Sequence, residues 1–518
     1  MNYRIKDYNQ NQNWLFPPSI QELIPEDHPV RIVNSVIEQI DIKPLLETYS
    51  KEGHPSYHPK MMLKIMVYAY MDNIYSSRKI EKAMRENINF MWLSGRQTVD
   101  HNTIARFRSN KLKLVFKDIF KQVVLLLASE GLVNLKRVYT DGTKIESAAG
   151  RYTFVWGNAI KTNKEKMTKQ LEEIWNYAQS IADEEDRDPE PPNFKKLDPE
   201  KVEKAADKIN KILKNNSKDS KKKAKARYIK NNFPANLRKY EQQEKVLKNR
   251  SSYSKTDEDA TFMRMKDDHM QNGQLKPGYN AQISTENQII VNYTLHQDTN
   301  DIHTLEPHLK NHKELYGEYP DELITDAGYG SEENYELLSE KQIIGYVKYS
   351  TFDKEQGKSK KKTNKNPFAR DALHYNEEGD FYVCPMGQRM EKSGERKVET
   401  KSGYKQTYSC YTAKNCKSCP LRSLCFKGKN NRTVERNHRL EYHKQKAREL
   451  LTSEIGEIRR KQRTADVEPT FAQLKHNRNF KRFTLRGLEK VEIEFGLHAL
   501  AHNLKKEKCL KGKLFLSF

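Results

Sequence analysis

The sequence predicts a mixed α/β fold with two long insertions, and three observations support this prediction. Apolar residues in 27–129 recur with a helical period. Between residues 137 and 349, short apolar runs typical of strands alternate with helical segments, which is the pattern of an α/β core. Residues 157–250 and 350–437 interrupt that pattern, the first with a charged helical composition and the second with clustered cysteines.

The first region, residues 27–129, is predicted to be mostly helical. Residues 59–75 are dense in Met, Leu, Ile and Tyr, which indicates a buried helix. A capping Asp100 begins a further helical pair, and Arg106 and Arg108 lie near its start. A short helix, a turn and a second helix with exposed Arg can enter a DNA groove. A helical bundle with a solvated face is the alternative, and these residues alone favour it.

Strands are predicted after this helical region. In "LKRVYTDGTKIES", Val138 and Thr140 alternate with other residue types, and the predicted strand ends at Asp141. The run "GYNAQISTENQIIVNYTLHQD" predicts two strands that are joined by a polar turn around Glu286 and Asn287.

A helix is then predicted from about residue 304 to 316, and the strand 323–325 leads directly into Asp326. A helix near 332–340 and a strand in "IIGYVKY" complete the series. Elements in this order pack as helices against a single sheet.

The two insertions differ in composition. Residues 157–250 are interrupted by the acidic "DEEDRDPEPP" and the basic "KDSKKKAKAR", which predicts a helical arm with solvated faces. Residues 350–366 are a predicted loop of Lys, Ser and Asn, and the cysteines follow it. Residues 438–510 are predicted to be mainly helical and basic.

The charge of the chain indicates a polyanionic partner. It carries 93 Lys and Arg against 70 Asp and Glu, which gives a formal net charge of +23, and nucleic acid is the first partner to consider. No apolar run approaches the roughly 18 to 20 residues of a membrane-spanning helix, so no membrane partner is expected. The amino terminus lacks the apolar stretch of a secretory signal. We therefore expect a cytoplasmic protein that associates with the nucleoid.

Asp141 and Asp326 occur in the same sequence context. Each follows a short strand-like run, is preceded by Thr, and is followed within two residues by Gly, which relaxes the backbone where a substrate approaches. Two such positions in one sheet can bring their carboxylates together. The alternative is that both are turn-initiating Asp residues, which are common at strand ends.

Glu468, in "VEPTFAQLKHN", is the third candidate carboxylate. A helix through this stretch places Lys475 two turns away on roughly the same face. A carboxylate among many cations is expected beside phosphates, and an ordinary surface Glu is the alternative. Pro469 inside a helix costs roughly 3 kcal/mol, so the helix that carries Glu468 is predicted to start or kink there.

Three blocks of the sequence resemble, in order, the catalytic blocks of bacterial insertion-sequence DDE transposases. They are "VYTDGTKIES", "ITDAGYGSEENYELL" and "VEPTFAQLKHN". The resemblance covers nearly the whole chain and implies an RNase H-like core. The implied organisation is a helical domain for DNA binding or dimerisation at 1–132 and a catalytic domain at 133–510. The catalytic domain would contain the charged helical insertion at 157–250 and the Cys-rich insertion at 350–437.

The resemblance assigns the acidic triad to Asp141, Asp326 and Glu468. It implies two Mg²⁺ or Mn²⁺ ions, with Asp141 as the bridging ligand, Asp326 on one ion and Glu468 on the other. In this family a Lys at the spacing of Lys475 contacts DNA. The sequence departs from the family at Thr464, where an Arg is expected.

Double-stranded DNA is the implied partner, at element ends and target, and the protein is expected to dimerise when it brings two ends together. The basic residues expected to contact DNA are Lys475, Arg463, Arg460, Arg478, Arg106 and Arg108.

Five of the six cysteines crowd into a short segment, which favours a metal site over disulfides. A closed, structural zinc site needs four such ligands, and the five candidates are Cys384, Cys410, Cys416, Cys419 and Cys425. Similar insertions in a subgroup of the transposases favour Cys384 over Cys410. Reduced thiols packed in a small core are the alternative.

Three functions are consistent with the sequence. The leading hypothesis is a transposase that binds, cleaves and joins DNA. The second is a zinc-containing, basic nucleic-acid-binding protein without catalytic activity, and the third is an RNase H-fold nuclease without strand transfer. All three acidic residues are present, which favours activity.

Overall fold

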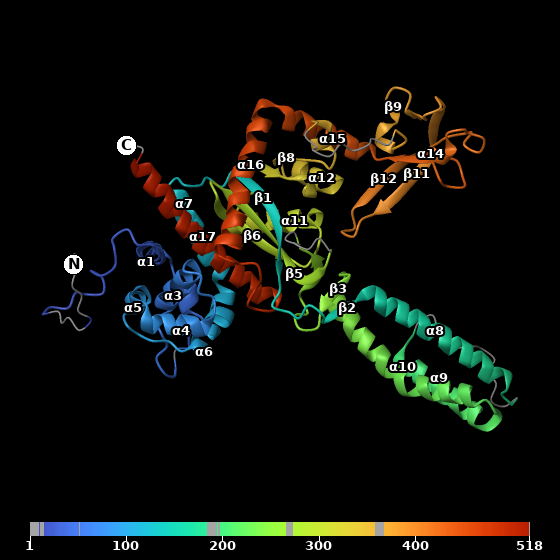
Figure 1. Cartoon of the computed structure of the whole chain (residues 1–518), viewed down its shortest axis with the longest axis horizontal. Helices are drawn as coiled ribbons and strands as arrows, with labels where there is room; N and C mark the ends of the chain where they lie inside the picture. The colour runs from blue at the N-terminus through green and yellow to red at the C-terminus, as the bar shows by residue number, and fades with distance from the viewer. Residues whose placement is uncertain are drawn as a thin grey trace, which may run out of the picture.

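The computed structural model describes residues 10, 15–50, 52–183, 194, 197–265, 273–357 and 367–516. The predicted acidic stretch lies outside these residues from position 184, and the predicted loop at 350–366 lies outside them from position 358. Figure 1 shows a central sheet with the N-terminal helices on one side, and a helical arm and a second sheet that project on the other.

The central sheet has six strands, in which β4 and β6 both pair with β5 and the order continues β5-β1-β7-β8. The strands are β1 (Arg137–Glu146), β4 (Thr261–Arg264), β5 (Leu275–Glu286), β6 (Ile289–His296), β7 (Glu322–Thr325) and β8 (Ile344–Val347). β1 is antiparallel to β5 and parallel to β7, and β8 is parallel to β7. This arrangement is that of an RNase H-like core, so the predicted fold class is confirmed.

Helices cover both faces of the sheet. They are α11 (Leu305–Tyr316), α12 (Glu332–Glu340), α16 (Glu454–Ala472) and α17 (Leu488–Leu516). Side chains alternate between the faces of a strand, so Asp141 and its partner Ile283 lie on one face, and Gly142 and Gln282 lie on the other. Helices α16 and α17 pack on the Asp141 face, and α11 packs on the Gln282 face.

Strand β1 continues past Asp141, so the predicted end of the strand at this residue is wrong. Its pairing with β5 runs on to Glu146. Asp-Gly is a common turn signal, but Gly142 has another role here, because a Cβ at this position would overlap the side chain of Gln282. Asp141 therefore lies within the sheet, and only Asp326 follows the end of a strand.

The N-terminal helices confirm the helical prediction for residues 27–129. They are α1 (Pro29–Gln39), α2 (Lys43–Leu46), α3 (Pro59–Met71), α4 (Ser77–Glu86), α5 (Ile88–Ser94), α6 (His101–Arg106) and α7 (Phe116–Ser129). Asp100 caps α6 by accepting hydrogen bonds from the backbone N–H groups of Asn102 and Thr103 at 2.9 and 3.0 Å. These helices share one hydrophobic core with α17 and the central sheet. None of the helices in the described part of the chain combines the length and the apolar composition of a membrane span.

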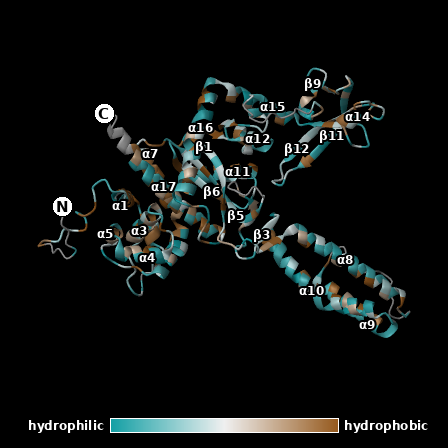
Figure 2. Cartoon of the chain, viewed as in Figure 1, coloured by the Kyte–Doolittle hydropathy of each residue, from teal (hydrophilic) through white to brown (hydrophobic). Residues whose placement is uncertain are grey.

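The first insertion is a three-helix arm, which confirms its predicted helical character. Its helices are α8 (Gly157–Ser180), α9 (Pro199–Asn216) and α10 (Ser220–Leu247). A short two-stranded ribbon of β2 (Phe154–Trp156) and β3 (Ser252–Ser254) joins the arm to the core. Figure 2 shows hydrophilic residues along much of these helices, and the apolar side chains form a separate cluster between them.

The second insertion forms an antiparallel sheet, which we call the cysteine-rich sheet. Its strands, in spatial order, are β9 (His374–Asn376), β10 (Phe381–Val383), β11 (Arg389–Glu399), β12 (Lys405–Thr412) and β13 (Thr433–Arg436). α14 (Arg422–Cys425) lies between β12 and β13 in the sequence, and α13 (Phe352–Glu355) and α15 (His438–Thr452) flank the insertion. Its cluster of buried apolar side chains is small: Tyr382, Met390, Tyr411, Ala413 and Val434.

Candidate active site

Asp141 and Asp326 meet around a single guanidinium group. Nη2 of Arg463, on α16, lies 3.0 Å from Oδ2 of Asp141 and 3.9 Å from Oδ2 of Asp326. Asp141 Oδ1 also accepts a hydrogen bond from the N–H of Gly142 at 2.7 Å, and Asp326 Oδ1 accepts one from the N–H of Gly328 at 2.9 Å. The structure therefore brings two of the predicted catalytic residues together, although they are far apart in the sequence.

The charges at this site are partly shielded from water. The side chain of Asp141 is 12% exposed and that of Arg463 is 13% exposed, whereas that of Asp326 is 40% exposed. Two carboxylates at close range repel each other, and an adjacent cation offsets this repulsion. The site can therefore accept positive charge, and solvent reaches it from the Asp326 side.

Glu468 lies on the exposed side of α16. In the part of the chain that the structure describes, it makes no hydrogen bond or ion pair with Asp141 or Asp326, and no three His, Cys, Asp or Glu side chains are grouped as a metal-binding cluster. The contacts in this structure thus join the two aspartates but do not include the predicted glutamate.

Helix α16 continues through Pro469, so of the two predicted alternatives, a start or a kink, the start at this residue is wrong. Proline has no N–H, and the carbonyl of Ala465 therefore loses its partner within the helix. Nε2 of Gln288 donates a hydrogen bond to this carbonyl at 2.9 Å. The backbone N–H of Gln288 also donates to Oδ1 of Asp466 at 2.9 Å. The turn between β5 and β6 thus supports the segment of α16 that carries Glu468.

The same turn residue also contacts α17. Nε2 of His502 lies 2.8 Å from the carbonyl oxygen of Gln288, and Nζ of Lys506 donates to Oε1 of Gln288 at 2.8 Å. Burial lowers the pKa of His502 to about 4, so the ring is neutral at pH 7 and its Nε2 carries the proton that is donated. Gln288 therefore joins both C-terminal helices to the sheet.

Two of the basic residues expected to contact DNA are buried by other contacts. Arg478 donates hydrogen bonds from Nη2 to the carbonyl of Ala501 at 2.9 Å, and burial lowers its pKa to about 10. Arg108 donates to the hydroxyl of Tyr70 and to the carbonyl of Tyr75, at 3.0 and 2.8 Å. Burial makes both side chains inaccessible to DNA in this structure, and both connect parts of the helical core.

The other predicted DNA contacts divide between the site, the interior and the surface. Arg463 lies at the aspartates, and Arg460 donates to the carbonyl of Leu451 at 3.0 Å, with its guanidinium 5.3 Å from the ring centroid of Phe352. Lys475 is also buried. Of the six, Arg106 is exposed to solvent.

Four of the cysteines surround one small cavity in the cysteine-rich sheet. Cys384, Cys416, Cys419 and Cys425 line it, and Cys410 is absent from its lining. This is the set of four that the sequence analysis favoured. The backbone N–H of Arg432 donates to Sγ of Cys416 at 3.3 Å, and the guanidinium of Arg432 donates to Sγ of Cys425 at 2.8 Å. These two hydrogen bonds place Arg432 beside the cysteines of the cavity.

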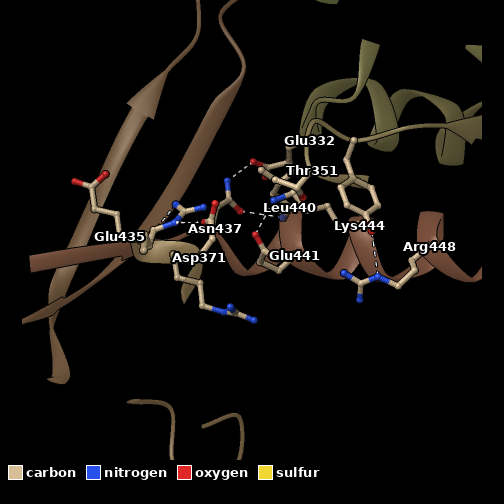
Figure 3. Close-up of polar contacts among 12 residues, drawn as sticks. Glu332, Thr351, Asp371, Glu435, Asn437, Leu440, Glu441, Lys444 and Arg448 are labelled. Carbon is tan, nitrogen blue, oxygen red and sulfur yellow. Dashed lines mark hydrogen bonds and ion pairs between the residues drawn. The ribbon is translucent and has the colours of Figure 1, made fainter. Parts of the chain in front are cut away.

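The chain that leaves the cysteine-rich sheet contacts α12 at the start of α15. Helix α12 begins shortly after Asp326. Nδ2 of Asn437 donates to Oε2 of Glu332 at 2.5 Å, and Oδ1 of Asn437 caps α15 by accepting from the N–H of Leu440 at 3.0 Å (Figure 3). Arg439 pairs with Oε1 of Glu332 at 2.7 Å. The side chain of Glu332 is fully buried between these partners.

Sequence reasoning missed Gln282 and Asp301 near Asp326, Gln288 beside α16, and Glu332 on α12. A weaker signal existed for Asp301, because it lies in the segment that follows β6, whereas Asp326 follows β7 directly. Single Gln and Glu residues carry no comparable pattern.

Comparison with known protein families gives two matches. Residues 383–507 match the family described as "Transposase DDE domain", and residues 18–110 match the family described as "Transposase domain (DUF772)". The first match includes Glu468 and the four cysteines that line the cavity, while Asp141 and Asp326 precede it. No curated protein and no solved structure matches the chain. The two matched segments are therefore similar to domains of transposases.

Proposed function

We propose that this protein cleaves the ends of its insertion sequence and joins the freed 3′ ends to target DNA at a metal-dependent site formed by Asp141, Asp326 and Glu468. The observation that carries the proposal is the convergence of Asp141 and Asp326 on one cationic group, Arg463, at the surface of an RNase H-like sheet. The transposase family matches support DNA as the substrate.

The three carboxylates would hold two Mg²⁺ or Mn²⁺ ions, which when bound stabilise the attacking and leaving oxygens of the phosphodiester. The donor set fits such ions, because hard cations prefer carboxylate oxygens and Asp326 is open to solvent. Arg463 offsets the repulsion between the aspartates and is also available to a DNA phosphate that approaches the site. Gln288 supports the α16 backbone next to Glu468.

The cavity lined by four cysteines is proposed to hold a structural zinc ion. Four thiols are the donor set of a closed tetrahedral site. Arg432 donates N–H···S hydrogen bonds to two of these thiols and so orients them in the cavity. Elemental analysis of metal-replete protein is expected to find one zinc per chain, and absence of zinc would overturn this part of the proposal.

Cleavage of defined DNA ends tests the catalytic proposal. The inverted repeats that flank the gene supply the sequence of a duplex oligonucleotide, and cleavage is measured with Mg²⁺ or Mn²⁺. We expect Asp141→Asn, Asp326→Asn and Glu468→Gln each to lower the rate on the order of 1000-fold, with DNA binding in a gel-shift assay nearly unchanged.

Glu457→Gln is the matched control, because Glu457 is an exposed carboxylate on the same helix as Glu468. Cleavage by the Asp326→Asn protein at the wild-type rate would remove Asp326 from the mechanism. Cleavage without joined products would identify a nuclease rather than a transposase, and binding without cleavage would identify a DNA-binding protein.

The proposed function implies that the protein acts on DNA of the nucleoid and brings the two ends of its insertion sequence together. We expect a homodimer when both ends are bound, and light scattering of the complex with end-bearing DNA measures this. A complex that contains a single protein chain would contradict it.

A further inference from the structure

A further carboxylate, Asp301, lies near Asp326 and is held in a fixed orientation. It begins the short helical turn Asp301–His303, between β6 and α11. Its Oδ1 accepts hydrogen bonds from Nδ2 of Asn280 at 2.7 Å and from Nε2 of Gln282 at 3.1 Å. Both amides belong to β5 and are fully buried, so they fix the position of the carboxylate.

The second oxygen of Asp301 is directed to the loop that carries Asp326. A Cβ built on Gly328 would lie 3.0 Å from Oδ1 of Asp326 and 3.5 Å from Oδ2 of Asp301, so the two carboxylates approach the same point. Among the residues that the structure describes, none donates a hydrogen bond to Oδ2 of Asp301. This oxygen therefore remains free to accept a hydrogen bond from a ligand.

Gln282 connects Asp301 to Gly142 and Tyr329, which follow Asp141 and Asp326 in the sequence. Its side chain passes over Gly142, the residue after Asp141, and its Oε1 accepts a hydrogen bond from the hydroxyl of Tyr329. Burial, together with the negative charges nearby, raises the pKa of Tyr329 well above its usual value, so the hydroxyl keeps its proton. Because Tyr329 donates to Oε1, the amide nitrogen of Gln282 must point to Asp301.

We propose that Asp301 is a positioning residue of the catalytic centre, whose Oδ2 accepts hydrogen bonds from water molecules on a divalent cation held at Asp326. The inference rests on the function proposed above. Divalent cations such as Mg²⁺ keep several of their waters when bound to protein. Groups that orient such waters from outside the ligand set typically change metal affinity by 10–100-fold.

Direct measurement of metal binding tests this role without any catalytic assay. Mn²⁺ is titrated into the full-length protein without DNA, and its affinity is measured by calorimetry or by electron paramagnetic resonance. We expect Asp301→Asn to weaken Mn²⁺ binding by about 10–100-fold. Asparagine retains an oxygen that can accept from Asn280 and Gln282, so the fold is expected to be kept.

Two further variants make the result decisive. Glu306→Gln removes an exposed carboxylate nearby on α11 and is expected to leave Mn²⁺ affinity unchanged. Asp301→Glu keeps the charge and is expected to recover part of the affinity that Asp301→Asn loses. The rise in melting temperature on adding Mn²⁺, measured against each variant's own metal-free value, separates metal binding from a general loss of stability.

The outcomes distinguish this inference from the proposed function. If Asp326→Asn abolishes Mn²⁺ binding while Asp301→Asn binds as the wild type does, the role of Asp301 is overturned and the metal site stands. If the wild-type protein binds no Mn²⁺, both are overturned.

Discussion

The arm of α8–α10 buries many large apolar side chains between its helices, whereas the cysteine-rich sheet buries few. A short ribbon, β2 and β3, and a small apolar cluster lie at the junction of the arm with the core. The cysteine-rich sheet instead contacts α12 through Tyr404, whose hydroxyl donates to Glu336, and Asn437 and Arg439 at the start of α15 bind Glu332. Small units with a small apolar core are usually stabilised by a metal or by docking. The two insertions thus show two different ways of stabilising a projecting unit.

Replacement of a cysteine that lines the cavity is expected to give the largest difference in stability between the two insertions. If the cysteine-rich sheet depends on zinc, Cys416→Ser or Cys419→Ser should unfold it, because metal binding supplies on the order of 10 kcal/mol of folding free energy in such sites. The arm should be unaffected. Hydrogen exchange measured by mass spectrometry, comparing amides of β12 with those of α9, reports both regions in a single experiment.

Cys410→Ser and Cys509→Ser are the matched controls, because neither thiol lines the cavity. Protection of β12 that survives in the Cys416→Ser protein would show that contacts with α12 and its own side chains hold the sheet.

Acidification should destabilise the central core but not the arm, which contains no histidine. Burial lowers the pKa of His296, His312 and His502 to about 4, below the unfolded value of 6.5. Between pH 4 and pH 6.5 the unfolded chain binds more protons than the folded chain. The stability of the folded state is therefore highest, with respect to these histidines, above pH 6.5, and it falls as the pH is lowered. At pH 5 each histidine should cost about 2 kcal/mol.

Three buried carboxyls act in the opposite direction and reduce the net loss. Burial raises the pKa of Glu286, Asp466 and Glu494, so these groups favour the folded state as the pH falls. Urea unfolding of the core and the arm at pH 7 and pH 5, followed by hydrogen exchange, measures the net effect. Equal loss of stability in both regions would contradict the role of the buried histidines.

Truncation of one aromatic side chain should weaken the arm alone. Trp175 on α8 packs against Phe194, with ring centroids 5.8 Å apart, and is almost fully buried. We expect Trp175→Ala to lower the stability of the arm by about 3–5 kcal/mol. Limited proteolysis should then cut within α8–α10, while the cysteine-rich sheet remains intact. Tyr228→Ala, at an exposed aromatic residue of α10, is the control.

The smallest effect is expected at the contact between α12 and the cysteine-rich sheet. Glu332→Gln keeps the size of the side chain but removes the charge that faces Arg439 and Asn437, and hydrogen bonds to charged groups contribute about 1.5–3 kcal/mol. Hydrogen exchange should rise at the α15 N-terminus, while the fold of the sheet is kept. Glu340→Gln, at an exposed position of the same helix, should change nothing.

Local patterns in the sequence predicted most of the elements, because periodicity and capping act over a few residues. The capping role of Asp100, the strand before Asp326 and the helices of the arm follow from such patterns. Local patterns could not predict which basic side chains are buried and which are exposed. Arg108 and Arg478 are buried by backbone and hydroxyl acceptors from other elements, and only the tertiary structure brings those acceptors to them.

Part of the candidate site could also be predicted from local sequence patterns. Asp141 and Asp326 were identified from their shared context, but the group between them, Arg463, was expected to contact DNA. The predicted strand end at Asp141 was wrong because the Asp-Gly pair resembles a turn, whereas Gly142 makes room for the side chain of Gln282. That requirement arises from β5, which is distant in the sequence.

The hydrogen bond from Gln288 to the carbonyl of Ala465 has a consequence for the order in which the chain folds. Because Pro469 leaves that carbonyl without a helical partner, α16 is incomplete until the β5–β6 hairpin is in place. We therefore expect the hairpin to form first and Glu468 to reach its final position late. A newly made chain would then remain unable to cut DNA until its C-terminal part has docked.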